Sequence, residues 1–185
     1  MRFVKFLLSL AVLLGLIYLL DNPQSMGETK LPALGRLLNP FSGFWQNAES
    51  VSLPENEQTL SLPGLQEEVR IIYDGRMVPH IFARNTHDAI LAQGYVTARH
   101  RLWQMDISIR DIGGRLSEIL GPNLLERDKS RRRQGMLVAA RREVEAWEQS
   151  EEIMAYMRAY ADGINAYIDQ LAPKDYPLEY KLLGY

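Results

Sequence analysis

The sequence predicts an α+β fold in which an N-terminal β-hairpin is followed by packed helices. Two short apolar runs, residues 69–73 and 78–82, flank the turn signal Asp74-Gly75, and this pattern is typical of a hairpin. Two longer stretches further along repeat apolar residues at alternating spacings of four and three, which is the spacing of one helical face. With 185 residues, the chain is long enough for one domain with a hydrophobic core.

The composition excludes several classes of function. The formal net charge of -2 offers no basic surface, so we expect no nucleic-acid partner. The sequence contains no cysteine, which excludes disulfides, zinc–thiolate sites, iron–sulfur clusters and a cysteine nucleophile. This composition is compatible with an oxidising compartment.

Residues 1–20 are expected to be a signal peptide or a membrane anchor. A basic start that ends at Lys5 precedes a run, residues 6–20, that is apolar apart from Ser9. The run is typical of a signal peptide and short for a membrane span, although Lys5 could snorkel to extend it. Because no A-x-A cleavage pattern follows, an uncleaved anchor, a cleaved signal and a buried helix all stay open. In the first two cases the rest of the chain is exported.

Residues 21–65 are expected to be a connector. Residues 31–38 and 41–45 are too apolar for a free linker, and either a membrane surface or the protein's own domain could cover them. Residues 49–58 are polar and predict a loop. Five prolines prevent a long helix in the connector: Pro23, Pro32, Pro40, Pro54 and Pro63.

Residues 66–185 are expected to form the domain, with helices after the hairpin. Thr86 is a suitable cap for a first long helix that Gly113-Gly114 would end, and Ser150 is a suitable cap for the last one. Gly94 and Gly163 lie inside these helices, where glycine usually marks a close approach by another backbone. Shorter helices are predicted around residues 115–120 and 137–147. The first apolar stripe is Leu91, Tyr95, Ala98, Leu102, Met105, Ile109 and Ile112, and the last is Ile153, Met157, Tyr160, Ile164, Tyr167 and Leu171.

The side chains that could carry chemistry form no complete catalytic site. His80, His87 and His100 match no zinc-binding spacing. We expect His80 to make turn or packing hydrogen bonds, and His87 and His100 to be exposed on the first long helix. Ser117 lies outside any G-x-S-x-G elbow and is expected to be a helix-surface serine. We therefore assign no catalytic, cofactor-binding or metal-binding residue in this chain.

Three carboxylates of the helical region lie close in sequence to two arginines. Asp106, Asp111 and Glu118 are expected to form surface ion pairs with neighbours such as Arg110 and Arg115. Such pairs contribute about 0.2–0.5 kcal/mol each on a helix.

Two further charged features have competing interpretations. Asp162 precedes Gly163 in an apolar stripe, and we interpret it as a buried structural carboxylate that needs a partner. The triplet at residues 131–133 is Arg-Arg-Arg, which could bind an anion or lipid headgroups. A solvated loop, or ion pairs with Glu126 and Asp128, are the simpler interpretations of this triplet.

Four blocks, in the same order, resemble the start of the α-chain in the penicillin acylase (penicillin amidase) family of N-terminal-nucleophile hydrolases. The resemblance covers about residues 69–185. The blocks are V-P-H-I at residues 78–81, Q-G-Y-V-T-A-R-H-R-L-W-Q-M-D at 93–106, G-R-L-S-E-I-L-G at 114–121 and Y-A-D-G-I-N-A-Y-I at 160–168.

Two positions depart from the family pattern. Family members usually have glycine directly before V-P-H-I, where this chain has Met77, so the hairpin turn is expected to differ. An acidic residue is common just before the R-L of the long helix, where this chain has His100. Neither change touches the catalytic chemistry of the family.

The resemblance implies a fragment of an αββα fold and a precursor that cuts itself into α and β chains. In the family, a serine at the new N-terminus of the β-chain attacks linear amide bonds of N-acyl compounds, and its own α-amine is the base. That serine, the acyl pocket and a calcium ligand of the full-length protein would lie beyond residue 185. The implied partners are the β-chain, a small N-acyl substrate and, through residues 1–20, the membrane. The implied location is the periplasm or the periplasmic face of the cytoplasmic membrane.

A second hypothesis needs no catalysis. The same residues are compatible with a membrane-anchored helical binding or scaffolding module. A downstream serine that becomes a new N-terminus would favour the hydrolase, whereas independent folding of residues 66–185 would favour the module.

Overall fold

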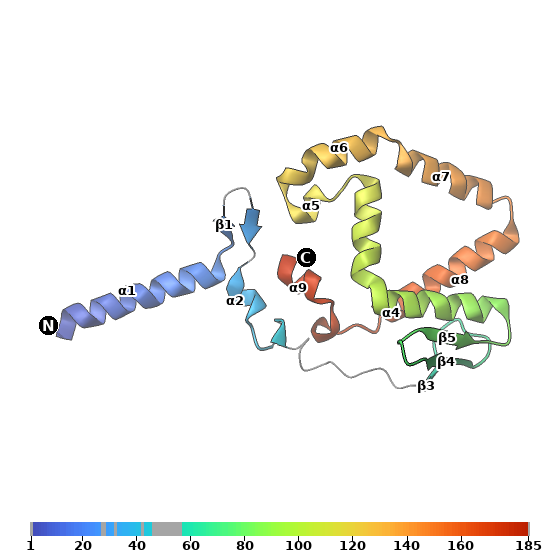
Figure 1. Ribbon diagram of the computed structural model, residues 1–185, viewed down its shortest axis with the longest axis horizontal. Coiled ribbons are helices and arrows are strands. Elements are labelled where there is room, and N and C mark those ends of the chain that lie inside the picture. Colours follow the sequence, from blue (N-terminus) through green and yellow to red (C-terminus); the bar gives the residue numbers. More distant parts are fainter. Residues whose placement is uncertain (1, 27–28, 32, 42, 46–56, 185) are drawn as a thin grey trace. The chain divides into compact units, whose positions relative to one another are not determined.

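The computed structural model describes residues 2–26, 29–31, 33–41, 43–45 and 57–184 (Figure 1). The chain divides into two compact units. Unit 1 comprises Met1–Val51, Leu116–Glu126 and Ala172–Tyr185, and unit 2 comprises Ser52–Arg115 and Arg127–Leu171.

Unit 1 contains one long apolar helix and several short elements. Helix α1 (Arg2–Asp21) is exposed along its whole length and is long and apolar enough to cross a membrane, a property that signal sequences share. Strands β1 and β2 pair as a small antiparallel ladder, and α2 contacts both α1 and α9. The short elements are β1 (Gln24–Met26), β2 (Thr29–Leu31), α2 (Leu34–Leu37), α5 (Ser117–Leu120), η1 (Pro122–Leu124), η2 (Pro173–Asp175) and α9 (Leu178–Leu183).

Unit 2 begins with a three-stranded antiparallel sheet of order β3-β4-β5. Strands β4 (Val69–Tyr73) and β5 (Pro79–Phe82) are the predicted hairpin, with Ile71 opposite Ile81. Strand β3 (Glu57–Leu60) pairs with the other edge of β4. The expected loop was therefore wrong at residues 57–58, whereas residues 49–56 lie outside the described part. A polar segment can serve as an edge strand because its backbone makes the ladder, whatever its side chains favour.

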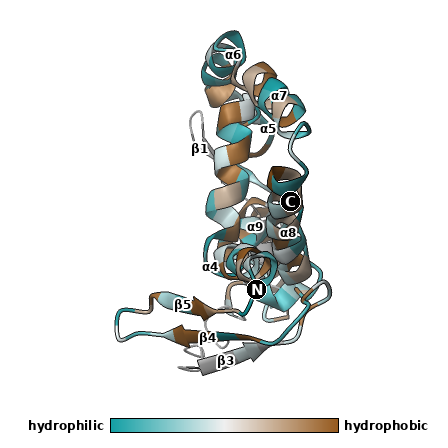
Figure 2. Ribbon diagram, turned by 90° about the vertical axis from the view of Figure 1, so that its right-hand side faces the viewer, coloured by the Kyte–Doolittle hydropathy of each residue, from teal (hydrophilic) through white to brown (hydrophobic). Residues whose placement is uncertain are grey.

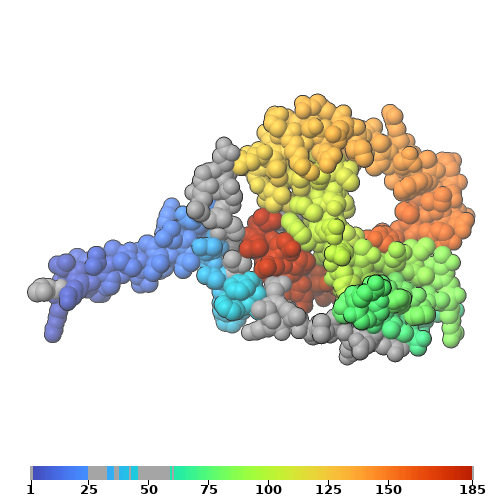
Figure 3. Space-filling view, in the orientation of Figure 1, coloured from blue at the N-terminus to red at the C-terminus, as the bar shows by residue number. Residues whose placement is uncertain are grey.

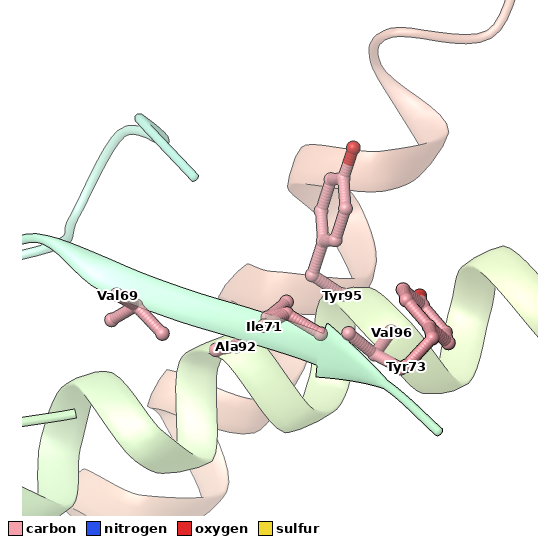
Figure 4. Packing of buried hydrophobic residues seen from close by; sticks show 6 residues of the cluster. All are labelled: Val69, Ile71, Tyr73, Ala92, Tyr95 and Val96. Atoms are coloured by element: carbon pink, nitrogen blue, oxygen red, sulfur yellow. The ribbon is translucent and has the colours of Figure 1, made fainter. Parts of the chain in front are cut away.

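The core of unit 2 lies between β4 and the first half of α4 (Thr86–Gly113), and Figure 2 shows the sheet as a layer against that helix. Alternate side chains of β4 point into this core, as a half-buried strand requires. The buried cluster is Val69, Ile71, Tyr73, Ala92, Tyr95 and Val96 (Figure 4).

Helix α4 differs from the prediction at both its start and its middle. Its cap is Asn85 rather than Thr86, because the Asn85 Oδ1 accepts from the Asp88 N–H at 2.7 Å. The backbone leaves helical geometry at Arg101, with φ -138° and ψ 17°. The apolar stripe is buried before this kink but not after it, where Ile109 is 68% and Ile112 46% exposed. The predicted end is correct, since Gly114 caps α4 in the left-handed conformation.

Helix α8 (Glu151–Ile168) crosses α4 in backbone contact. Ser150 caps α8 as predicted and accepts from the Ile153 N–H at 3.4 Å. A Cβ on Gly94 would meet the carbonyl oxygen of Tyr160, and a Cβ on Gly163 would meet that of Leu91. The predicted close approach at both glycines is therefore confirmed. Each of the two helices has a glycine at the point where a backbone carbonyl of the other helix comes close.

Helices α6 (Leu125–Arg133) and α7 (Met136–Trp147) follow α4 and α5 in the chain. The solvated-loop interpretation of the arginine triplet was wrong, since these residues form the last turn of α6. Helix α7 contacts both α4 and α8, yet its apolar side chains Met136, Leu137 and Val144 are exposed. The space-filling view shows an opening framed by α4, α7 and α8 (Figure 3).

The β4–β5 turn keeps a left-handed residue where the family usually has glycine. Met77 has φ 62°, the one positive φ of a non-glycine residue among those described. Asp74 holds the turn, because its Oδ1 accepts from the N–H groups of Arg76 at 2.8 Å and Val78 at 2.9 Å. The turn geometry therefore explains the glycine of the family, and Met77 adopts it under steric strain.

We predict that Gly163→Ala destabilises the protein by about 2 kcal/mol or more. Alanine gains about 1 kcal/mol of helix propensity, but its methyl group would press on the Leu91 carbonyl, which cannot rotate away. The free energy of unfolding from urea denaturation measures the effect. Gly75→Ala is the control, since a Cβ there has nothing within 4 Å. Equal stability of both variants would contradict the proposed contact.

We predict that Met77→Gly stabilises the protein by about 1 kcal/mol. A left-handed conformation costs a residue with a Cβ about 1–2 kcal/mol, and glycine avoids this cost at the expense of a more flexible unfolded chain. Thermal unfolding measures the gain. Val78→Gly, at the neighbouring residue without positive φ, should be destabilising instead.

Candidate functional site

The three histidines lie apart and serve different local contacts. His80 stands 3.6 Å from Asp74 in the hairpin turn, as a turn role predicts. His87 is only 33% exposed, so its expected exposure was wrong, because its Nδ1 lies 3.1 Å from the buried Asp88. His100 is exposed as expected, but its Nε2 lies 3.0 Å from the Tyr73 hydroxyl. Within the part of the chain that the structure describes, no three histidine, aspartate or glutamate side chains gather as metal ligands.

Tyr73 and His100 join the sheet to α4 through a pair of neutral groups. Burial raises the pKa of the Tyr73 hydroxyl, which Arg99 opposes. Partial desolvation of its ring beside Tyr73 lowers the pKa of His100, and the nearby Arg99 and Arg101 lower it further. The two rings pack edge to face with centroids 5.6 Å apart. Two neutral rings can be packed between a strand and a helix without desolvating a charge. The contact between Tyr73 and His100 therefore helps to hold α4 against β4.

Asp88 is a fully buried charged group of unit 2. Its side chain is fully buried in the first turn of α4, and its two oxygens accept from the N–H groups of Gln66 and Glu67, each at 2.9 Å. Asn85 donates to it at 2.7 Å. Burial alone would raise the pKa of this carboxyl, but the hydrogen bonds from Gln66, Asn85, His87 and Glu67 outweigh burial and lower the pKa to about 2. Asp88 thus fastens the segment before β4 to the start of α4.

Asp111 and the arginines of α6 form the second charged cluster. Arg127 donates to both oxygens of Asp111 at 2.7 and 2.9 Å, and Arg131 donates to it at 2.9 Å. Hydrogen bonds from Arg127 and then Arg131 hold the pKa of Asp111 well below its usual value. Arg132 donates to the carbonyl of Gly114 at 2.9 Å. Two arginines of the triplet therefore tie α6 to the end of α4.

The remaining ion-pair predictions are partly correct. Asp106 pairs with Arg110 at 2.9 Å, as expected for side chains four residues apart. Asp111 was expected to pair with a near neighbour in sequence, and it pairs with α6 instead. Ser117 is half-buried at the start of α5, rather than a plain surface serine.

Asp162 is exposed, so its interpretation as a buried structural carboxylate was wrong. Successive residues of a helix point about 100° apart, as 3.6 residues per turn implies. Gly163 faces α4 at the crossing, and its predecessor therefore points away from that contact.

Sequence reasoning missed the role of Asp88. The signal was present, since Asn85 and Asp88 stand three residues apart before an apolar run. That spacing resembles a capping box, in which the cap and the third helical residue bind each other's backbone. Here the Asp88 carboxylate accepts from the side-chain amide of Asn85 and from the backbone N–H groups of Gln66 and Glu67, and the spacing could not reveal these last two partners.

The hairpin and the crossed helices define an α+β scaffold, and the hydrogen-bonded clusters around Asp88 and Asp111 hold its elements together. The chain belongs to the penicillin amidase family, whose model matches residues 68–185. The α+β class that the sequence predicted is thereby confirmed.

Curated relatives include both penicillin and acyl-homoserine lactone acylases. Penicillin acylase 2 proenzyme of Pseudomonas sp. (strain SE83) is 41% identical over 139 residues, 75% of this chain and 17% of the relative. Penicillin G acylase of Escherichia coli is 38% identical over 115 residues, 60% of this chain and 13% of the relative. Acyl-homoserine lactone acylase QuiP of Pseudomonas aeruginosa is 35% identical over 135 residues, 72% and 16% of the two chains. This chain therefore spans less than a fifth of each.

A solved structure of a thermostable penicillin G acylase from Alcaligenes faecalis matches the fold. Its TM-score is 0.56 at 31% identity, and the match covers 63% of this chain and 62% of the solved chain. The hairpin and helices described above thus form a scaffold that this chain shares with the family.

We predict that Asp88→Asn destabilises unit 2 by about 1–3 kcal/mol, because an amide cannot accept from both backbone N–H groups and still satisfy Asn85 and His87. The folded pKa of about 2 lies below the usual value of 3.8. The contribution of Asp88 is therefore complete above about pH 4 and is lost as the pH falls toward 2. Urea unfolding at several pH values measures it.

The matched control is Asp162→Asn, at an exposed aspartate of α8. This variant should keep the stability and pH profile of the parent protein. An Asp88→Asn variant with the parent's stability between pH 2 and pH 7 would exclude the anchoring role.

Proposed function

We propose that this chain is the N-terminal part of the α-chain of a hydrolase that cleaves linear amide bonds of N-acyl compounds. The nucleophile would be a serine downstream of residue 185, freed as a new N-terminus when the precursor cuts itself. The observation that supports this most is the family match over residues 68–185, together with a relative named a proenzyme.

In this proposal the chemistry is supplied outside the chain. An N-terminal serine carries its own base in its α-amine, so the histidines and Ser117 described above are not needed for catalysis. An oxyanion hole would stabilise the tetrahedral intermediate from the β-chain. Calcium, if bound, would be held by the full-length protein. Residues 1–185 alone would be inactive, and their role would be to support the β-chain.

The proposed location is the periplasm or the periplasmic face of the cytoplasmic membrane. Helix α1 supports this, since it is exposed and apolar over Arg2–Asp21 and carries its basic residues at its start. An uncleaved α1 would anchor the protein, and a cleaved one would release it.

The alternative is a membrane-anchored helical module without catalysis. One observation favours it, namely that unit 2 closes a buried cluster among its own residues. A monomer of residues 66–185 that unfolds cooperatively without a partner would support the module.

The decisive experiment is expression of the complete gene. We predict two chains, of which the second begins with serine, and hydrolysis of one or more members of a series of phenylacetyl, dicarboxylic and long-chain acyl amides. Replacing that serine by alanine should leave a single uncut precursor without activity. A stop codon directly after Tyr185 would contradict the proposal.

A further inference from the structure

The connector that follows α1 has small residues buried and large apolar residues exposed. Ala33 and Gly43 are buried, whereas Phe41 is 84% exposed. A segment that faces water has the opposite distribution, because burial of the large apolar side chains stabilises it most. We give the name connector patch to four exposed apolar side chains of this segment: Leu34, Leu38, Phe41 and Trp45.

The turn that exposes Phe41 is held by hydrogen bonds. The Asn39 Oδ1 accepts from the Phe41 N–H at 2.8 Å, and the Asn39 carbonyl accepts from the Gly43 N–H at 2.7 Å. The neighbouring rings of Phe44 and Trp45 lie with their centroids 4.5 Å apart. The exposure of Phe41 therefore belongs to a defined local structure, and large apolar side chains gathered at a surface in this way are typical of an interaction site.

Helix α2, which carries the start of the connector patch, lies against the last turn of α1. A Cβ on Gly35 would come within 2.8 Å of the Leu20 carbonyl oxygen, so glycine permits a backbone contact between the two helices. At the same end of α1, the Asn22 side chain donates to the Tyr18 carbonyl at 3.0 Å. The connector patch thus begins beside the point where the apolar helix ends and polar residues follow.

The chemistry of the connector suits a lipid surface. Residues 29–48 contain no aspartate or glutamate, and their charged residues are Lys30 and Arg36. Aromatic and other apolar side chains combined with cations are features of segments that lie at the headgroup level of a membrane. A helix of 20 residues is about 30 Å long, which matches the hydrocarbon core of a bilayer. If α1 crosses a bilayer, its last turn and the adjoining α2 therefore lie at the bilayer surface.

We propose that the connector patch rests on the lipid bilayer at the point where α1 leaves it. Phe41 and Trp45 enter the layer between the headgroups and the acyl chains, so the membrane contact extends beyond residues 1–20. A single helix lets the protein tilt and rotate about its axis, and a second contact beside it fixes the orientation. The inference rests on the proposed location, in which α1 enters the membrane, and not on the hydrolysis of amides.

Photolabelling of the full-length protein in vesicles tests the contact. The vesicles consist of phosphatidylethanolamine and phosphatidylglycerol, with a phospholipid that carries a diazirine in its acyl chain near the headgroup. After irradiation and tryptic digestion, lipid should be attached to the peptide of residues 6–30, from α1, and to that of residues 37–70, which contains Phe41 and Trp45. The control peptide is residues 134–141 of α6 and α7, where Met136 and Leu137 are apolar and exposed but remote in sequence from α1. It should carry no lipid.

Two results would overturn the proposal. One is label on residues 6–30 with none on residues 37–70, which would mean that α1 enters the membrane and the connector patch does not. The other is equal label on residues 37–70 and 134–141, which would mean that the lipid reacts with any exposed apolar segment. Absence of label from residues 37–70 in a protein isolated without residues 1–20 counts with the first result.

Variants of the connector patch test its side chains. Phe41→Asp combined with Trp45→Asp should lower the yield of label on residues 37–70 by about tenfold or more, because each carboxylate would have to leave water. The yield on residues 6–30 should stay unchanged. Phe41→Leu combined with Trp45→Phe is the matched control and should keep both yields, since the side chains stay apolar. If the aspartate variant does not fold by circular dichroism, Phe41→Ser with Trp45→Ser replaces it. An unchanged yield in the folded variant would overturn the role of these two side chains.

This proposal and the proposed function can fail separately. The label is measured without any substrate, so a protein that hydrolyses no amide can still carry lipid on residues 37–70 and retain the membrane contact. An active protein without label on residues 6–30 or 37–70 would keep the proposed hydrolysis and exclude both the membrane location and the role of the connector patch.

Discussion

The backbone contact between α4 and α8 is the constraint on which the rest of unit 2 depends. At Gly94 and Gly163 each helix leaves a space that the other fills with a carbonyl group. The contact brings Tyr95 against Tyr167 with ring centroids 5.5 Å apart, and Tyr95 donates to Gln170 at 3.1 Å. Any side chain at either glycine would separate the helices and open the core beside them.

Two aspartates hold further elements of unit 2 at the two ends of α4. Asp88 binds the segment before β4 to the first turn, so the sheet is held on the same half of α4 that carries Gly94. Asp111 binds α6 to the last turn through Arg127 and Arg131. Both carboxylates have their pKa lowered by the hydrogen bonds that they accept. In unit 2 the crossing of α4 and α8 therefore lies between two hydrogen-bonded aspartates, one in the first turn of α4 and one in its last turn.

The sequence predicts those features whose cause is local. The hairpin follows from Asp74-Gly75 between apolar runs, and both glycines of the crossing stand out inside regular stripes. The kink at Arg101 could not be predicted from the sequence, because no proline or glycine lies at this position. Strand β3 is mostly polar in sequence, and its backbone pairs with β4. The partners of Asp111 lie 16 and 20 residues away, so spacing along one helix could not identify them. Asp162 was wrongly predicted to be buried, because it precedes Gly163 in the sequence but points away from the helix contact that Gly163 makes.

The exposed part of the α4 stripe connects the fold to the proposed function. A regular apolar stripe predicts burial along its whole length, yet Ile109 and Ile112, beyond the kink at Arg101, are exposed. Apolar side chains of α7 and α8 are exposed as well, namely Met136, Leu137, Val138, Val144, Ile153 and Met157. These helices frame the opening seen in Figure 3. Exposed apolar surface of this extent is typical of an interface. In the hydrolase proposed above, the β-chain would bury this surface.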